Sequence, residues 1–376
     1  MEASELIRSN FWTERRARVL APPSLEEEGA RLERELRGDE GVVFATSGAS
    51  GRPKWVFMRR AALLSSAEAV NKHLSVSPRD RLLLPLPLYH VGGFGMAARA
   101  FVGGCDLRAL PGRWDGLRFV EALREHGSTL TSLVPTQVHD LVVQNLEAPR
   151  SLRAVIVGGA SLDELKGQAA RELGWPLLQS YGMTEAASQV ATAHLERAKG
   201  PFRAAPLPIM DQWECRLCPE GRLELRGDAL FDFYLRWDGS VFCREKDRDA
   251  EGWFRSGDAA ELKGRSLTLR GRADRRVKVL GEFVDLQVLE DELRAQLGGL
   301  EVYLLPIPDG RRGWLLQPVV EGSASEGGKV DDLIELINER VPGFSRMERA
   351  CFMDQLPRTA LGKVDGATTR IILLSR

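Results

Sequence analysis

The sequence predicts an α/β protein with a large, layered α/β domain on the N-terminal side, a β-rich subdomain within it, and a small α+β domain on the C-terminal side. The chain has 376 residues, which is more than one hydrophobic core usually supports. Short apolar runs alternate with helical stretches up to about residue 190, as in a sheet covered by helices. Beyond about residue 212 the segments become short, β-rich and rich in turns, and two amphipathic helices follow.

The large domain opens with a predicted helix and continues in buried strands. Residues 24–38 predict the first helix, which begins with a capping box of Ser24 and Glu27. The apolar run at 81–89 is broken by prolines, so we expect a strand that ends in an irregular loop. The run at 152–160 predicts a buried parallel strand that ends in a glycine turn.

The change of texture along the chain predicts where the two domains meet. We expect the large domain to span residues 1–273, with its β-rich subdomain at about 200–273, and the small domain to span residues 274–376. Leucines at helical spacing between 286 and 297, and apolar residues between 330 and 337, predict two amphipathic helices in the small domain.

Composition excludes several classes of protein. The chain carries 52 basic and 53 acidic side chains, so its formal net charge is −1. Nucleic-acid and membrane-surface binders usually carry a basic excess, so we expect no nucleic-acid partner. The N-terminal stretch lacks the apolar core of a signal peptide, and no apolar run approaches a membrane span in length. We therefore expect a cytoplasmic protein without stable membrane insertion. The five scattered cysteines do not suggest a disulfide framework.

The stretch ATSGASGRPKW at 45–55 follows an apolar run that predicts a buried strand. Small residues, hydroxyls and Lys54 after a strand are typical of a loop that binds phosphate. The stretch is not a Walker A loop, because Pro53 precedes the lysine and Trp55 follows it. Taken alone, the stretch is more consistent with a glycine- and serine-rich surface loop.

This stretch does not stand alone. Together with five later motifs it resembles, in order, the motifs of the adenylate-forming superfamily, which contains acyl- and aryl-CoA synthetases, adenylation domains of peptide synthetases and luciferases. The later motifs are PLYHVGG (87–93), SYGMTE (180–185), SGD (256–258), GRADRRVKVLGE (271–282) and PRTALGK (357–363). The resemblance implies a large α/β domain and a small, mobile C-terminal domain. Only 45 residues precede Thr46, fewer than in typical members.

The resemblance implies ATP and Mg²⁺ as cofactors and a carboxylic acid that attacks the α-phosphate, with pyrophosphate leaving. Tyr181 would stack on adenine, Thr184 would donate to the α-phosphate, and Glu185 would bind Mg²⁺ as a metal ligand. Asp258 would accept hydrogen bonds from the ribose hydroxyls, assisted by Arg272. The remaining nucleotide-binding residues that it implies are Thr46, Ser47, Gly48, Ser50, Gly51, Lys54, Gly159, Ala160 and Gly182.

The C-terminal motifs imply a second half-reaction with coenzyme A as co-substrate. Lys363 would be the catalytic lysine of adenylate formation, carried on the mobile domain. Asp274 would be the hinge between an adenylating and a thioester-forming pose. Lys278 and Gly281 would line the channel for the pantetheine arm, and His90 would border the acyl pocket.

Within the superfamily, YGMTEAASQVAT resembles o-succinylbenzoate–CoA ligases of menaquinone biosynthesis. A second carboxylate on that acid requires polar groups in the pocket as well as apolar walls. The expected substrate residues are Gly92, Gly93, Phe94, Gly158, Ser188, Gln189 and Thr192, with Phe94 stacking on the ring. Three alternatives stay open: a ligase for another aryl or acyl acid, a stand-alone adenylation enzyme, and an inactive nucleotide-binding relative. The oligomeric state is also open, with a homodimer among the alternatives.

Overall fold

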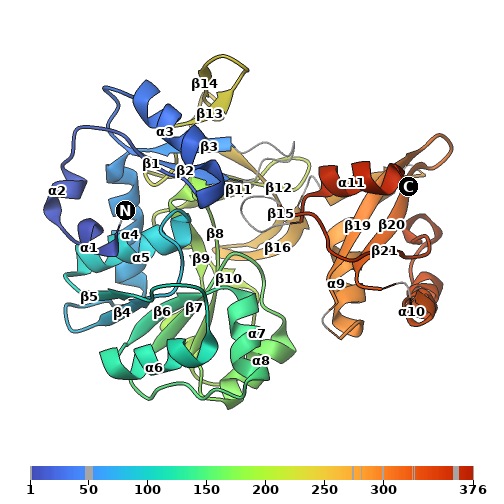
Figure 1. Ribbon diagram of the computed structural model, residues 1–376, viewed down its shortest axis with the longest axis horizontal. Helices are drawn as coiled ribbons and strands as arrows, with labels where there is room; N and C mark the ends of the chain where they lie inside the picture. Colours follow the sequence, from blue (N-terminus) through green and yellow to red (C-terminus); the bar gives the residue numbers. More distant parts are fainter. Residues whose placement is uncertain are drawn as a thin grey trace.

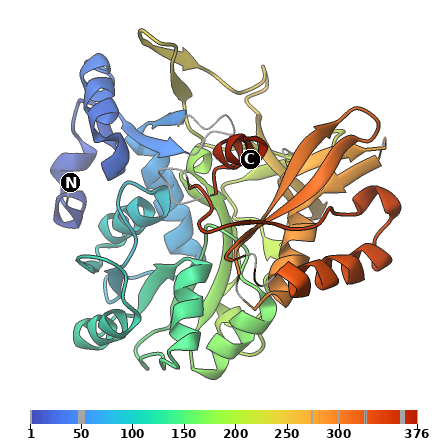
Figure 2. The same ribbon diagram turned by 45° about the vertical axis from the view of Figure 1, so that its right-hand side comes forward.

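The computed structural model describes residues 2–46, 54–272, 275–280, 282–298, 300–323, 325, 327–358 and 364–375. The chain forms a large lobe, which ends with strand β16, and a smaller lobe beside it that contains the C-terminus (Figure 1). In the rotated view, helix α11 of the small lobe lies in front of the large lobe (Figure 2).

The central sheet of the large lobe has the strand order β5-β4-β6-β7-β8-β9. Neighbouring strands are parallel except for β9, which returns antiparallel to β8. The strands are β4 (Arg81–Leu84), β5 (Asp106–Ala109), β6 (Leu130–Leu133), β7 (Ala154–Val157), β8 (Leu177–Met183) and β9 (Ser188–Thr192). The sheet explains the predicted alternation of apolar runs and helices and confirms the layered α/β class.

Helices cover both faces of this sheet because its strands are apolar on both sides. Leu82 and Leu84 point into the core shared with α4 and α5, whereas Leu83 between them points into the core under the other helices. The covering helices are α4 (Arg60–His73), α5 (Val91–Gly103), α6 (Gly116–His126), α7 (Pro135–Val143) and α8 (Glu164–Glu172).

A second sheet carries the predicted phosphate loop, in the order β1-β2-β3-β13-β14. Strands β2 and β3 are antiparallel, with Thr46 opposite Lys54 at the open end. The strands are β1 (Arg18–Leu20), β2 (Val42–Thr46), β3 (Lys54–Met58), β13 (Phe233–Trp237) and β14 (Phe242–Glu245). The loop between β2 and β3 lies outside the described residues.

The first helices pack against these two sheets. Helix α3 (Glu26–Glu35) lies over Trp55 of the second sheet. The predicted capping box is wrong, because Ser24 lies inside a 3₁₀ turn (Pro23–Leu25) and Leu25 is the residue that caps α3. The short helices α1 (Ala3–Leu6) and α2 (Ser9–Trp12) complete the core in front of α5.

A third sheet forms the β-rich part of the large lobe, in the order β10-β16-β15-β12-β11. Strands β15 and β16 are antiparallel and place Asp258 opposite Arg272. The strands are β10 (Leu207–Pro208), β11 (Glu214–Leu217), β12 (Arg222–Arg226), β15 (Phe254–Lys263) and β16 (Ser266–Arg272). Besides the turn before α3, the lobe contains the 3₁₀ turns η2 (Thr184–Ala186) and η3 (Leu195–Ala198).

The small lobe is built around the sheet β19-β20-β21, with the hairpin β17–β18 ahead of it. Its buried apolar residues cluster with one another, as Leu293 and Ile334 show. Its elements are β17 (Arg276–Val279), β18 (Glu282–Asp285), α9 (Leu286–Gln296), β19 (Val302–Asp309), β20 (Gly313–Glu321), α10 (Gly327–Arg340), a 3₁₀ turn (Gly343–Ser345), β21 (Cys351–Met353) and α11 (Gly366–Leu374). The α+β texture predicted for this part of the chain is confirmed.

A partly buried ion pair joins the segments at the edge of the central sheet at which β4, β6 and β7 begin. The Asp80 carboxylate accepts two hydrogen bonds from Arg153, at 2.7 and 2.9 Å, one from the Thr129 hydroxyl at 2.7 Å and one from the Ser77 backbone N–H at 2.9 Å. Burial raises the pKa of Asp80, but these hydrogen bonds outweigh burial and lower it to about 2. The three strands therefore share one charged contact.

We expect Asp80→Asn to destabilise the protein by about 3 kcal/mol, because the substitution leaves the partly buried Arg153 without its counter-charge. Since the folded-state pKa is depressed, the contribution of Asp80 is present above about pH 4 and is lost as the pH falls toward 2. Urea denaturation at pH 7 and pH 3 measures both effects. Asp163→Asn, at the exposed start of α8, is the matched control and changes stability little, since asparagine caps a helix as well as aspartate. Equal stability of the two variants would contradict the prediction.

Candidate active site

The end of β8 and the turn η2 bring the SYGMTE motif to the centre of the large lobe. Gly182 is required there, because a Cβ atom would lie 1.6 Å from the backbone oxygen of Ser188 on β9. Ala187 and Ser188 have positive φ values of 50° and 110°, so the chain turns sharply between the two strands. The tight hairpin fixes Thr184 and Glu185 at its tip.

Glu185 is held by β13 and lies close to the start of β3. The Tyr234 hydroxyl donates to Glu185 Oε1 at 2.8 Å, and the Phe231 backbone N–H donates to the Glu185 carbonyl at 2.8 Å. The Lys54 ammonium lies 4.8 Å from the centre of the Tyr234 ring. A carboxylate and a lysine of two separate motifs therefore meet at one tyrosine, which sequence reasoning missed because an aromatic residue in a strand is usually a core residue.

The donor set at Glu185 fits Mg²⁺, which usually takes one or two protein carboxylates and completes its shell with phosphate and water. Within the described part of the chain, the Oε2 atom of Glu185 has no hydrogen-bond partner, so it can serve as a ligand. No cluster of three or more histidine, cysteine or acidic side chains occurs among the described residues. Glu185 is thus the residue that would bind the metal, with a phosphate-bearing substrate supplying other ligands.

Tyr181 and Asp258 meet on the other side of β8. The Tyr181 hydroxyl donates to Asp258 Oδ2 at 2.6 Å, and Arg272 Nη1 lies 3.6 Å from Asp258 Oδ1. Burial raises the pKa of Tyr181 well above its usual value, and the Asp258 carboxylate adds to that shift. The phenol therefore stays a proton donor, and it orients a carboxylate whose remaining lone pairs can accept hydrogen bonds from a diol.

The glycine turn after β7 and the start of α5 face this hairpin. Gly159 has a φ of +84°, and the backbone oxygen of Ala160 accepts a hydrogen bond from Gln179 at 3.1 Å. His90 is half-buried at the start of α5, with its ring 4.7 Å from that of Tyr89. An added Cβ at Gly95 would lie 3.4 Å from Ser188, so α5 and β9 approach closely.

Three of the expected substrate residues have another role. Phe94 has no exposed surface and packs against Phe11, Trp12 and Phe44, so the expectation that it stacks on a substrate is wrong. Gly93 does not leave open space, because an added Cβ would lie 2.3 Å from the backbone oxygen of Pro87. Thr192 is fully buried and hydrogen-bonded to Gln189 and Ser180. Gly158, by contrast, has open space at the Cβ position, and a Cβ at Gly92 would make only an ordinary contact with Leu86 at 3.9 Å.

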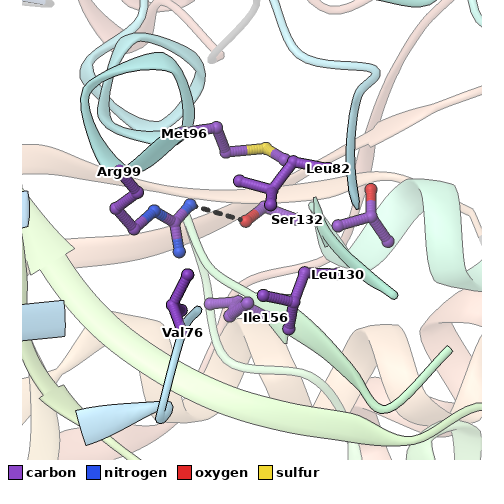
Figure 3. A pocket seen from close by; sticks show the side chains of 8 residues that line it. Val76, Leu82, Met96, Arg99, Leu130, Ser132 and Ile156 are labelled. Atoms are coloured by element: carbon purple, nitrogen blue, oxygen red, sulfur yellow. Dashed lines mark hydrogen bonds between the residues drawn. The ribbon is translucent and has the colours of Figure 1, made fainter. Parts of the chain in front are cut away.

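A buried arginine lies at the bottom of the region between α5 and β9. Arg99 is 6% exposed, and it donates to Ser132 Oγ at 3.2 Å (Figure 3) and to Gln189 Oε1 at 3.5 Å. No carboxylate of the described residues pairs with it, and burial lowers the pKa of its guanidinium to about 10. A cavity of about 10 Å³ beside it has the size of about one water molecule. The sequence pattern did not identify Arg99 as a candidate site residue. The feature that identifies it is burial without a counter-charge, which depends on the tertiary structure.

Several of the expected site residues belong to segments outside the described part of the chain. Ser47, Gly48, Ser50, Gly51, Asp274, Gly281 and Lys363 lie outside the described residues. Lys278 is described and lies exposed on β17 of the small lobe. Among the described residues, no helix combines the length and apolar character needed to cross a bilayer.

Comparison with known proteins supports the resemblance drawn from the motifs. A family model described as "AMP-binding enzyme" matches residues 16–235, more than half of the chain. The chain is 27% identical over 336 residues to the 2-succinylbenzoate–CoA ligase of Enterococcus faecalis, covering 86% of this chain and 67% of that protein. It is 30% identical over 344 residues to the indoleacetate–CoA ligase of Aromatoleum aromaticum, covering 86% of this chain and 65% of that protein.

A solved structure confirms the fold class. The o-succinylbenzoate coenzyme A synthetase of Bacillus subtilis, in complex with ATP and magnesium ion, superposes with a TM-score of 0.73 at 20% identity. The match covers 97% of this chain and 81% of that chain. Both lobes therefore have counterparts in that enzyme.

We expect Arg99→Met to leave the free energy of unfolding within about 1 kcal/mol of the parent, because methionine removes a buried cation that lacks a carboxylate partner. Arg153→Met is the matched control and costs about 3 kcal/mol, since it breaks the pair with Asp80. Urea denaturation of both variants measures the difference. A loss at Arg99 as large as the loss at Arg153 would identify Arg99 as a structural residue.

Proposed function

We propose, since the chain belongs to the AMP-binding enzyme family, that it is an AMP-forming acid–CoA ligase and that its acid is 2-succinylbenzoate. The substrate carboxylate attacks the α-phosphate of ATP, pyrophosphate leaves, and the thiol of coenzyme A then displaces AMP from the acyl-adenylate. The names of the relatives support a CoA ligase of an aromatic acid, and their identity of 27–30% leaves the acid itself to be argued from the site.

The nucleotide end of the site supports adenylate formation. Asp258, oriented by Tyr181, accepts from the ribose hydroxyls, and Thr184 at the tip of the hairpin donates to the α-phosphate. Glu185 binds the metal, which when bound neutralises charge on the phosphate oxygens. Lys54 lies at the start of β3, where it pairs with the outer phosphates. These side chains are positioned before ATP arrives, which is what stabilisation of a developing charge requires.

The observation that supports 2-succinylbenzoate as the acid is the burial of Arg99 without a carboxylate partner among the described residues. A buried guanidinium without a counter-charge is costly to keep, and a substrate with a second carboxylate would supply the missing partner. Arg99 is joined through Gln189 to Ser188, which faces Gly95 at the base of the acid side. The cavity beside Arg99, which Ser132 and Thr131 also line, has space for one water molecule. We assign the ring carboxylate of 2-succinylbenzoate to Arg99 as the missing counter-charge, whereas its succinyl carboxylate reacts.

We expect the parent to form a CoA thioester from 2-succinylbenzoate in preference to 4-phenylbutyrate, benzoate and medium-chain fatty acids. Arg99→Met is expected to lower kcat/KM for 2-succinylbenzoate by roughly tenfold to a hundredfold, the worth of a charged hydrogen bond, and to leave 4-phenylbutyrate unchanged. A thioester assay over this panel measures both. If monocarboxylates, indoleacetate included, react as well as the dicarboxylate, the choice of acid is wrong and the ligase proposal stands.

We further propose Lys363 as the lysine that stabilises the charge developing at the α-phosphate. We expect Lys363→Ala to slow pyrophosphate release by ~10²–10³-fold and to leave ATP affinity nearly unchanged, because one preorganised donor is lost in the transition state. Lys329→Ala, which removes an exposed lysine of the small lobe, is the control and keeps the parent rate. A pyrophosphate-release assay with isothermal titration of ATP decides; a Lys363→Ala variant with the parent rate would refute this role.

A further inference from the structure

We propose that Tyr234 is a positioning residue that holds the carboxylate of Glu185 and the ammonium of Lys54 in a fixed relation. The proposal rests on the proposed function, in which Glu185 binds the metal and Lys54 pairs with phosphate. Its hydroxyl sets the rotamer of the metal ligand, and its ring sets the direction of the lysine. Metal and phosphate charges would then meet a preformed arrangement.

The backbone around Tyr234 gives it a fixed place. Tyr234 pairs with Val56 in the antiparallel register of β13 with β3, and Lys54 begins that same strand. Three residues before it, Phe231 donates its backbone N–H to the carbonyl of Glu185 at 2.8 Å. One short segment therefore holds Glu185 twice, by its main chain and by its side chain.

The chemistry of the contact favours a neutral, donating phenol. Tyr234 is 3% exposed, and burial raises the pKa of its hydroxyl far above the usual value, with the Glu185 carboxylate adding to the shift. The hydroxyl therefore donates a charge-assisted hydrogen bond to Oε1, which leaves Oε2 available to a ligand. The Lys54 ammonium over the ring gains a cation–π contact, so both charges are oriented by one side chain.

The preceding residue on β13, Phe233, shows which side chain is sufficient where only packing is needed. Phe233 points to the opposite face of the sheet and stacks on Phe57 with ring centres 4.5 Å apart. A ring without a hydroxyl is sufficient there, because no carboxylate needs to be oriented. A phenylalanine ring at position 234 would pack equally well against Phe231. We therefore assign the hydroxyl of Tyr234 to the hydrogen bond with Glu185 and not to packing.

The test is Tyr234→Phe, which keeps the ring and removes the hydroxyl. Isothermal titration of ATP over a range of Mg²⁺ concentrations measures the half-saturating Mg²⁺, and titration with EDTA present measures ATP binding without metal. We expect the half-saturating Mg²⁺ to rise by about tenfold, the worth of one hydrogen bond to a charged group, with metal-free ATP binding unchanged. Tyr234→Leu is expected to weaken metal-free ATP binding as well, because the Lys54 contact is lost.

Two controls separate positioning from packing. Phe233→Leu disturbs the opposite face of the same strand, and we expect lower stability with the parent half-saturating Mg²⁺. In a Glu185→Gln background, Tyr234→Phe is expected to add no further change, since its effect passes through the carboxylate. A Tyr234→Phe variant with the parent Mg²⁺ dependence, or with an equal effect in the Glu185→Gln background, would overturn the proposal. A parent protein that binds ATP without any Mg²⁺ dependence would instead refute the proposed function on which it rests.

Discussion

The candidate site depends on the tight hairpin from β8 through η2 to β9. Its backbone approach at Gly182 leaves no space for a side chain, so the two strands are fixed relative to each other. Tyr181 on β8 reaches Asp258, Glu185 at the tip reaches Tyr234, and Gln189 on β9 reaches Arg99. The residues proposed to bind nucleotide, metal and acid are therefore attached to one short segment, and their spacing is set by its hydrogen-bonded register.

The local sequence pattern predicts the scaffold well. Strands buried on both faces must be apolar throughout, so the run at 152–160 identifies a central strand without any knowledge of its partners. The motif order then predicts which strand ends carry polar side chains, and Asp258 and Arg272, expected together, do lie opposite each other on β15 and β16, whereas the hydrogen bond from Tyr181 to Asp258 was not expected. These features could be predicted because each depends on residues close together in the chain or on a motif that keeps its spacing.

The parts that the sequence did not predict depend on contacts between distant segments. Phe94 becomes a core residue because Phe11 and Trp12 of the first helices close over it. Arg99 becomes a candidate for ligand binding because the residues around it bring hydroxyl, amide and carbonyl groups and no carboxylate. Whether a glycine leaves space for a ligand is equally a tertiary property, since the backbone of Pro87 fills the space beside Gly93.

The polar groups around the hairpin share one physical property. Contacts within the described protein satisfy only part of the hydrogen-bonding capacity or charge of each group. Among the described residues, Arg99 has neutral partners and no counter-charge, Glu185 uses Oε1 and leaves Oε2, and Asp258 keeps lone pairs beyond those used by Tyr181. Partly satisfied polar groups inside a protein cost stability, so a fold that served packing alone would have replaced them. Their charges differ in sign along the hairpin, with acidic groups at the nucleotide and metal end and a cation at the acid end. A ligand that satisfies all of them carries a diol and metal-bound phosphates at one end and a carboxylate at the other, which is the charge pattern of ATP beside a dicarboxylic acid.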